Sequence, residues 1–152
     1  MDLKWEDSLN TGVWCFDEEH RAILKMLNIL RGMMESGDAK DAKNFTRQVI
    51  IPYLIKHLRH EEEIMSLMGY PWYEDHQRSH LAIEKLFRES LEAVRSEHKF
   101  AVRHFQAIAL GWLFGHINKT DKKYGRFFAE KGLIDRLNTV DPAKPPTALI
   151  EI

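Results

Sequence analysis

Seven side chains that can bind a metal interrupt the apolar faces of the helices predicted below. They are five histidines and two carboxylates: His20, His57, Glu61, His76, His80, His116 and Asp121. A buried side chain that can ionise or bind a metal needs a partner that offsets its desolvation. Any one of these histidines alone would more often be a surface or hydrogen-bonded core residue than a ligand. The set as a whole therefore indicates a metal site.

The spacing of these residues supports a shared site. His57 and Glu61 are four residues apart, and so are His76 and His80. Four residues turn a helix by roughly 400°, so each pair projects side by side from consecutive turns. The five-residue step between His116 and Asp121 instead rotates the carboxylate by about 140°, which predicts a local bulge in that helix.

The kinds of ligand restrict the metal. Several imidazoles with carboxylates suit iron, zinc, copper or nickel. Seven side chains exceed the four ligands of tetrahedral zinc, so two ions are expected. Two roughly octahedral irons would offer about twelve positions, of which five histidines, two bridging carboxylates and a bridging oxide or hydroxide fill about eleven. One position would stay open, as reversible binding of a small molecule requires.

Apolar periodicity predicts four helices separated by short turns. The expected helices run from an N-cap at Asp17 to Gly37, from about Asp41 to Met68, from Pro71 to about Ser96, and from about Lys99 to Glu130. Pro52 predicts a kink or break in the second helix, because proline lacks the N–H that a helix interior needs. Short connections favour an all-α, antiparallel up-down-up-down four-helix bundle with an N-terminal arm. In such a bundle all seven candidate ligands lie toward the same end.

Residues 1–132 are expected to form the bundle, and residues 133–152, with three prolines, an irregular C-terminal tail. A net charge of −1 and scattered basic residues disfavour nucleic acid, and no apolar run is long enough for membrane insertion. The absence of a signal-like segment and the single cysteine, Cys15, predict a cytoplasmic protein with a buried thiol. Apart from Glu61, the run Glu61–Glu62–Glu63 is expected to be solvated, and His60, His98 and His104 are not expected to be ligands.

The motifs resemble those of the hemerythrin family over residues 5 to 128. The opening motif is Trp-x-x-x-Leu-x-x-Gly-Val, ending at Val13, followed by Asp17-x-x-His20. The central motif is His57-x-x-x-Glu61-Glu62-x-x-Met65 with Tyr70-Pro71 and His76-x-x-x-His80. The closing motif is Trp112-x-x-x-His116-Ile117-x-x-Thr120-Asp121. Glu19 and Leu58 are departures, since the family commonly has glutamine and phenylalanine there.

The resemblance implies two irons bridged by Glu61, Asp121 and an oxide or hydroxide. It implies that His76, His80 and His116 hold one iron and that His20 and His57 hold the other, where O2 would bind. Azide or nitric oxide are alternative small ligands. Apolar neighbours of the open position could form a dry pocket: Ile23, Leu24, Leu58 and Leu113.

The function expected from the resemblance is reversible O2 binding for storage, transport or delivery, without enzymatic turnover. The first alternative is a di-iron enzyme that oxidises ferrous iron or handles peroxide or nitric oxide. The chain lacks the Glu-x-x-His motif of ferritin-like oxidases, which weighs against this alternative. The second alternative is an oxygen or redox sensor, which would need a partner protein.

Overall fold

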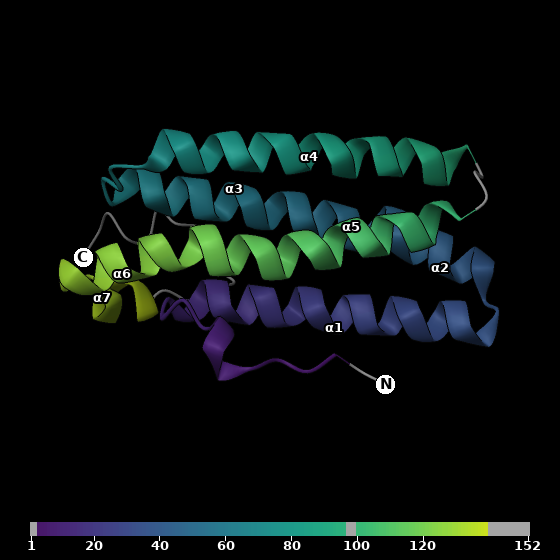
Figure 1. The fold of residues 1–152 in the computed structure, drawn as a ribbon, viewed down its shortest axis with the longest axis horizontal. Coiled ribbons are helices and arrows are strands. Elements are labelled where there is room, and N and C mark those ends of the chain that lie inside the picture. The colour runs from purple at the N-terminus through teal and green to yellow at the C-terminus, as the bar shows by residue number, and fades with distance from the viewer. Residues whose placement is uncertain (1–2, 97–99, 140–152) are drawn as a thin grey trace.

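Four long helical segments lie side by side in the computed structural model, which describes residues 3–96 and 100–139 (Figure 1). Neighbouring segments run antiparallel, which confirms the predicted all-α four-helix bundle. The first and third segments each pack against the second and the fourth. The segments comprise, in chain order, α1 (Trp14–Ser36); α2 (Ala39–Phe45), η2 (Thr46–Ile50) and α3 (Ile51–Leu67); α4 (Tyr73–Arg95); and α5 (Ala101–His116), η3 (Ile117–Asp121) and α6 (Lys122–Glu130). A 3₁₀ turn, η1 (Asp7–Leu9), precedes the bundle and α7 (Ile134–Asn138) follows it.

Glycines in the left-handed conformation follow three of the segments, as predicted. Gly132, after α6, has φ 67°, and Gly37 and Gly69, which connect neighbouring segments, have φ 85° and 65°. A helix commonly ends in this way, because glycine adopts positive φ without a steric penalty. The turns at Gly37 and Gly69 send the chain back along the bundle and thereby bring the start of one helix beside the end of the next.

The expectation that Asp17 caps the first helix is wrong. Helix α1 begins at Trp14, so Asp17 lies within its first turn. The buried carboxylate instead accepts hydrogen bonds from the backbone N–H and hydroxyl of Thr11, at 2.7 and 2.8 Å, and from the N–H of Gly12 at 3.1 Å. Asp17 thus fixes the segment before the helix rather than the N-terminus of the helix itself.

Two π-helical turns interrupt the second and fourth segments. The first, Thr46–Ile50, ends two residues before Pro52, where a kink or break was expected. The N–H of Ile51 bonds to the carbonyl of Thr46, five residues earlier, so the helix continues through a wider turn. The second, Ile117–Asp121, covers the step from His116 to Asp121 and confirms the predicted bulge.

Residues after the bundle were expected to be irregular, which is wrong for Ile134–Asn138, the residues of α7. Leu137 is fully buried, which anchors this short helix against the bundle. The side-chain oxygen of Asn138 accepts a 2.8 Å hydrogen bond from the N–H of Trp14. Pro142, Pro145 and Pro146 lie outside the described residues, and the boundary at residue 132 stays a prediction.

A second contact between the beginning and the end of the described chain involves Gly125 on α6. A Cβ atom at this position would lie 2.1 Å from the carbonyl oxygen of Thr11. The two backbones therefore touch, and this approach requires glycine.

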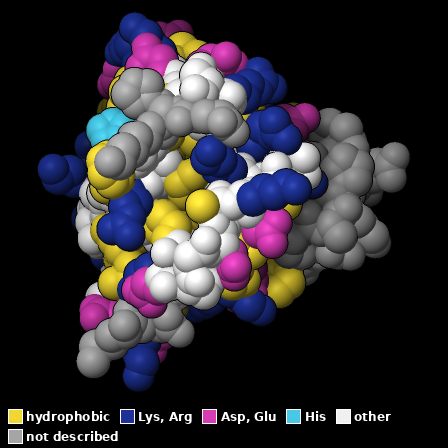
Figure 2. Space-filling view, turned by 90° about the vertical axis from the view of Figure 1, so that its right-hand side faces the viewer, with side chains coloured by type: hydrophobic (Ala, Val, Ile, Leu, Met, Phe, Trp, Pro, Cys, Tyr) yellow, Lys and Arg dark blue, Asp and Glu magenta, His cyan; other side chains and the backbone are white. Residues whose placement is uncertain are grey.

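Two apolar clusters fill the interior of the bundle. The larger cluster contains Leu30, Leu54, Phe87 and Phe105, among others, and extends toward the end where α2 lies. Figure 2 looks onto that end, where basic, acidic and hydrophobic side chains are interspersed. The smaller cluster lies near the opposite end and includes Phe16, Met65 and Tyr124.

Cys15 also belongs to the smaller cluster and is fully buried, as predicted. Burial, together with the nearby negative charge of Glu19, raises the pKa of its thiol to about 12. The thiol is therefore neutral at physiological pH. Among the described helices, none combines the length and the apolar character that crossing a membrane would need.

Candidate metal centre

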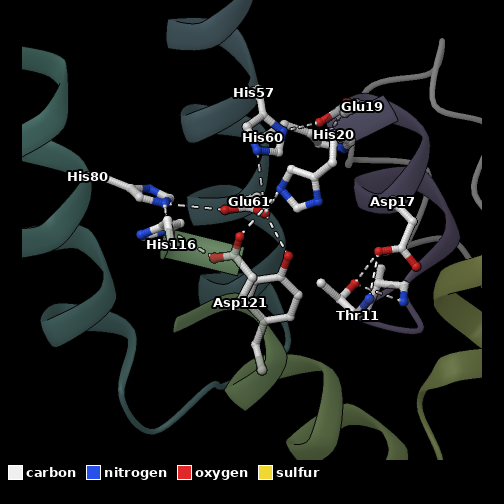
Figure 3. Close-up of polar contacts among 12 residues, drawn as sticks. Thr11, Asp17, Glu19, His20, His57, His60, Glu61, His80, His116 and Asp121 are labelled. Carbon is white, nitrogen blue, oxygen red and sulfur yellow. Dashed lines mark hydrogen bonds and ion pairs between the residues drawn. The ribbon is translucent and has the colours of Figure 1, made fainter. Parts of the chain in front are cut away.

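The seven candidate ligands meet in one layer between the two apolar clusters. Each is at most 7% exposed, and together they come from α1, α3, α4, α5 and η3. In Figure 3, His20, Glu61, His80, His116 and Asp121 point toward one another from α1, α3, α4, α5 and η3. We call this set the metal-binding layer: His20, His57, Glu61, His76, His80, His116 and Asp121. The convergence expected from the sequence is therefore present in the structure.

Three histidines of the layer converge on a single point. The Nε2 atoms of His76, His80 and His116 are separated by 3.0, 3.1 and 3.3 Å. Nitrogens bound at right angles to one metal ion, about 2.1 Å away, would be about 3.0 Å apart. Three imidazole nitrogens do not satisfy one another well as hydrogen-bond donors and acceptors, but they suit a shared cation.

The other two histidines face the same carboxylates from the opposite side. The rings of His20 and His57 lie 4.6 Å apart, centre to centre. The Nε2 atoms of both histidines are 3.6 Å from Oε1 of Glu61. This smaller group could hold a second ion.

Both carboxylates connect the two groups of histidines. Oε1 of Glu61 faces His20 and His57, whereas Oε2 lies 3.5 Å from His76 and 3.2 Å from His80.

Asp121 repeats the arrangement. Its Oδ2 lies 3.4 Å from Nε2 of His20, whereas its Oδ1 lies 3.4 Å from Nε2 of His76 and 2.9 Å from Nε2 of His116. Each carboxylate thus turns one oxygen toward each group. This is the arrangement that a carboxylate bridging two ions requires.

Unpaired buried atoms in the layer fit bound cations. Oxygens of Glu61 and Asp121 and ring nitrogens of His20 and His57 are buried without a hydrogen-bond partner. Leaving such groups unsatisfied costs roughly 1–3 kcal/mol each, and more for charged groups. Cations at the two positions would satisfy the oxygens and the inward-facing nitrogens, so the residues present fit a pair of metal ions.

The electrostatics of the layer also favour cations. Burial opposes ionisation of Glu61, but the surrounding histidines outweigh it and hold the carboxyl pKa well below its usual range. For His80, burial is likewise outweighed, here by Glu61 and Glu62, and its pKa is raised to about 9. Without metal, protons on imidazoles therefore offset the charge of the carboxylates, which stay ionised. Metal binding would displace those protons, since imidazole binds metal in its neutral form.

Three residues that the sequence did not single out as partners support the ligands. The Nδ1 atom of His57 is 2.7 Å from Oε2 of Glu19, and Nδ1 of His80 is 3.1 Å from Oε1 of Glu62. Tyr124 donates a 2.6 Å hydrogen bond from its hydroxyl to Glu61. Such contacts orient ligands and fix the imidazole tautomer.

The finding for Glu62 corrects the expectation that it would be solvated, because its exposure is only 5%. The step from Glu61 to Glu62 turns the side chain by about 100° around the helix, onto the side that faces α4. The periodicity of α3 alone does not predict that Glu62 contacts His80 on α4. The signal that the sequence offered was the position of Glu62 directly after the candidate ligand Glu61. His60, which was not expected to be a ligand, lies outside the layer and hydrogen-bonds to Glu19. His104 is exposed, and His98 lies outside the described residues.

The four residues expected to form an apolar pocket are all buried and belong to the larger apolar cluster: Ile23, Leu24, Leu58 and Leu113. Each lies in sequence within four residues of a histidine of the layer. Their role in binding a small ligand stays a prediction.

Comparisons with known proteins agree with this site. Residues 11–128 match the family model described as the hemerythrin HHE cation binding domain. The chain is 30% identical over 122 residues to a bacteriohemerythrin of Stenotrophomonas maltophilia, which covers 80% of this chain and 78% of the relative.

Similar relatives occur in other bacteria. A bacteriohemerythrin of Pseudomonas aeruginosa is 30% identical over 132 residues, with the same coverage of both chains. One from Methylococcus capsulatus is 27% identical over 122 residues, covering 76% of this chain and 87% of the relative. The matched range spans the positions of all seven residues of the metal-binding layer, and the chain belongs to the hemerythrin family.

Proposed function

We propose that this protein binds O2 reversibly at a pair of non-haem iron ions, for storage, transport or delivery. One observation carries the proposal: two unequal groups of histidines share two carboxylates. His76, His80 and His116 form the larger group, and His20 and His57 form the smaller. With equal sharing of the bridges, the ion beside the smaller group has one protein ligand fewer. A small molecule would bind at that position.

Two irons held by the seven residues of the layer would supply the reversible redox chemistry that binding of O2 needs. The residues of this chain supply the surroundings. Glu61 and Asp121 turn one oxygen toward each histidine group, and the hydroxyl of Tyr124 holds Glu61 in that orientation. Ile23, Leu24, Leu58 and Leu113 would exclude water, which would otherwise promote loss of the ligand with the irons left oxidised.

A binding role without turnover is supported by the composition of the layer. Five histidines accompany two carboxylates, whereas ferritin-like oxidases use Glu-x-x-His motifs that this chain lacks. The absence of turnover is part of the proposal.

A visible absorption spectrum tests the proposal. The protein is loaded anaerobically with ferrous iron, its metal content is measured, and it is then exposed to O2 and returned to vacuum. We expect two irons per chain and an oxygen-dependent spectrum that disappears under vacuum. Azide should bind the oxidised protein at the iron beside His20 and His57. One iron per chain, or oxidation on first exposure with continued consumption of O2, would contradict the proposal.

A further inference from the structure

Glu19 joins a candidate ligand to a histidine outside the metal-binding layer. Its Oε2 lies 2.7 Å from Nδ1 of His57, and its Oε1 lies 2.6 Å from Nδ1 of His60. One carboxylate thus accepts from two imidazoles that come from adjacent turns of α3, while Glu19 itself lies on α1 (Figure 3). The side chain of Glu19 is 14% exposed and that of His60 is 10% exposed. The arrangement is therefore largely shielded from solvent.

The corresponding carboxylate on the three-histidine side has different partners. Glu62 contacts Nδ1 of His80, but its Oε2 also accepts a 2.9 Å hydrogen bond from Arg59 and one of 3.3 Å from Gln77. The Arg59 guanidinium, which also pairs with Glu84, offsets part of the negative charge of Glu62. Among the described residues, the polar contacts of Glu19 are with the two histidines. The negative charge of Glu19 therefore acts more strongly on His57 than the charge of Glu62 acts on His80.

This difference matters because of how a carboxylate acts on a ligand imidazole. A hydrogen bond from Nδ1–H to a carboxylate fixes the tautomer whose Nε2 lone pair faces the metal, and it raises the basicity of that nitrogen. A more basic nitrogen binds a cation more tightly and stabilises the more highly charged oxidation state. His57 belongs to the group that has only two histidines, where stronger donation has the larger effect.

We propose that Glu19, held in place by His60, is a positioning residue that strengthens the two-histidine half of the centre and compensates for its missing third imidazole. This inference rests on the proposed pair of metal ions and not on reversible O2 binding.

The first test is metal binding by Glu19→Gln, with Glu62→Gln as the matched control. Both variants remove one charge without changing side-chain size. Purified metal-free protein is titrated with Co²⁺, a spectroscopic probe that O2 chemistry does not complicate, in competition with a chelator. For Glu19→Gln we expect one of the two ions to bind roughly 10–100-fold more weakly. For Glu62→Gln we expect a smaller loss that affects the other ion.

Proton NMR of the Co²⁺-loaded proteins assigns the affected ion. The Nδ1–H proton of His57 gives a paramagnetically shifted signal that should move in Glu19→Gln, while the signal of His80 stays in place. His60→Leu, which leaves Glu19 without its second support, should reproduce part of the loss. Unchanged affinity in Glu19→Gln, or an equal loss of both ions, would overturn the inference.

A reduction potential provides a readout that a purely structural role would not change. In the iron-loaded protein, Glu19→Gln should raise the potential, because the more highly charged state loses more stabilisation. A tenfold preferential loss of ferric affinity corresponds to about 59 mV for a one-electron step. An unchanged potential would contradict the inference. A wild-type protein that binds two ions but never releases O2 would refute the proposed function and leave the role of Glu19 to these tests.

Discussion

The metal-binding layer and the larger apolar cluster are formed by the same four helical segments, one beside the other. In the layer, seven ionisable side chains are buried, and several of their atoms lack a hydrogen-bond partner. In the cluster, residues such as Leu54, Phe87 and Phe105 are buried to the same degree and contain no polar side-chain atom. The cluster can be stabilised by apolar burial alone, whereas the charges of the layer need compensation by protons or metal ions.

This difference indicates a division of tasks along the bundle. The apolar cluster should hold the helices together whether or not metal is present. The layer depends on that support, because burial of unpaired carboxylates and imidazoles opposes folding unless protons or cations compensate. Metal should therefore act mainly on the layer, and mutations in the two regions should separate stability from metal binding.

Removing a bridging carboxylate should have the largest effect. In Glu61→Ala, both ions lose a ligand and part of their charge compensation. We expect affinity to fall at least about a thousandfold for each ion, or roughly 8 kcal/mol over the two. Metal analysis after gel filtration measures this loss. Glu63→Ala, which changes an exposed neighbour, should retain two ions. Retention of metal by Glu61→Ala would show that this residue is not a bridge.

A cavity in the larger apolar cluster should lower the stability of the fold and leave metal binding unchanged. Phe87 is fully buried, and Phe87→Ala should lower the free energy of unfolding by about 3–5 kcal/mol. Urea denaturation of the metal-free protein provides the measurement. Leu86→Ala, at a position 42% exposed, should cost much less. If Phe87→Ala also reduced metal binding to one ion, the two regions would not be independent.

Metal removal from the wild-type protein should have an effect of comparable size. At a free metal concentration a hundredfold above the dissociation constant, binding to the folded state contributes about 2.7 kcal/mol per site. Hydrogen exchange should localise this effect. We expect faster exchange around η3 and the start of α4 in the metal-free protein, with little change around Phe105. A uniform increase along the chain would contradict the proposed division.

A polar substitution at the boundary between the metal-binding layer and the larger apolar cluster should have the smallest effect. Leu113→Asn should increase the rate of autoxidation roughly tenfold, equivalent to about 1.4 kcal/mol in the barrier, while two irons remain bound. Leu30→Asn introduces the same group deep in the larger cluster and is the matched control. An equal increase in the control would indicate general destabilisation instead of a wetter ligand pocket.

The sequence predicted the features that repeat along a single helix. Spacings of four identified His57 with Glu61, and the glycines at 37 and 69 marked helix ends. The geometric mismatch between His116 and Asp121 predicted a bulge, which the structure forms as a π turn. These predictions succeed because the rise and rotation of a helix are nearly constant.

Features that depend on contacts between helices were missed. Glu19 and His57 are 38 residues apart, and nothing in either local sequence indicates that their side chains meet. Asp17 has the residue type of an N-cap, yet its carboxylate is used by Thr11 and Gly12. The short helix α7 was missed because nearby prolines suggested irregular structure, while burial of Leu137 stabilises it.

The joined ends of the described chain have a consequence for the order of biosynthesis. Trp14 and Asn138 are linked by a hydrogen bond across 124 positions, and Gly125 presses against Thr11. During translation, α1 leaves the ribosome long before α6 and α7 exist. Contacts of such large sequence separation form late, because they close the longest loops. His20 should therefore lack its partner Asp121 until the fourth helical segment has been synthesised. Metal should accordingly bind after translation of the bundle and not during it.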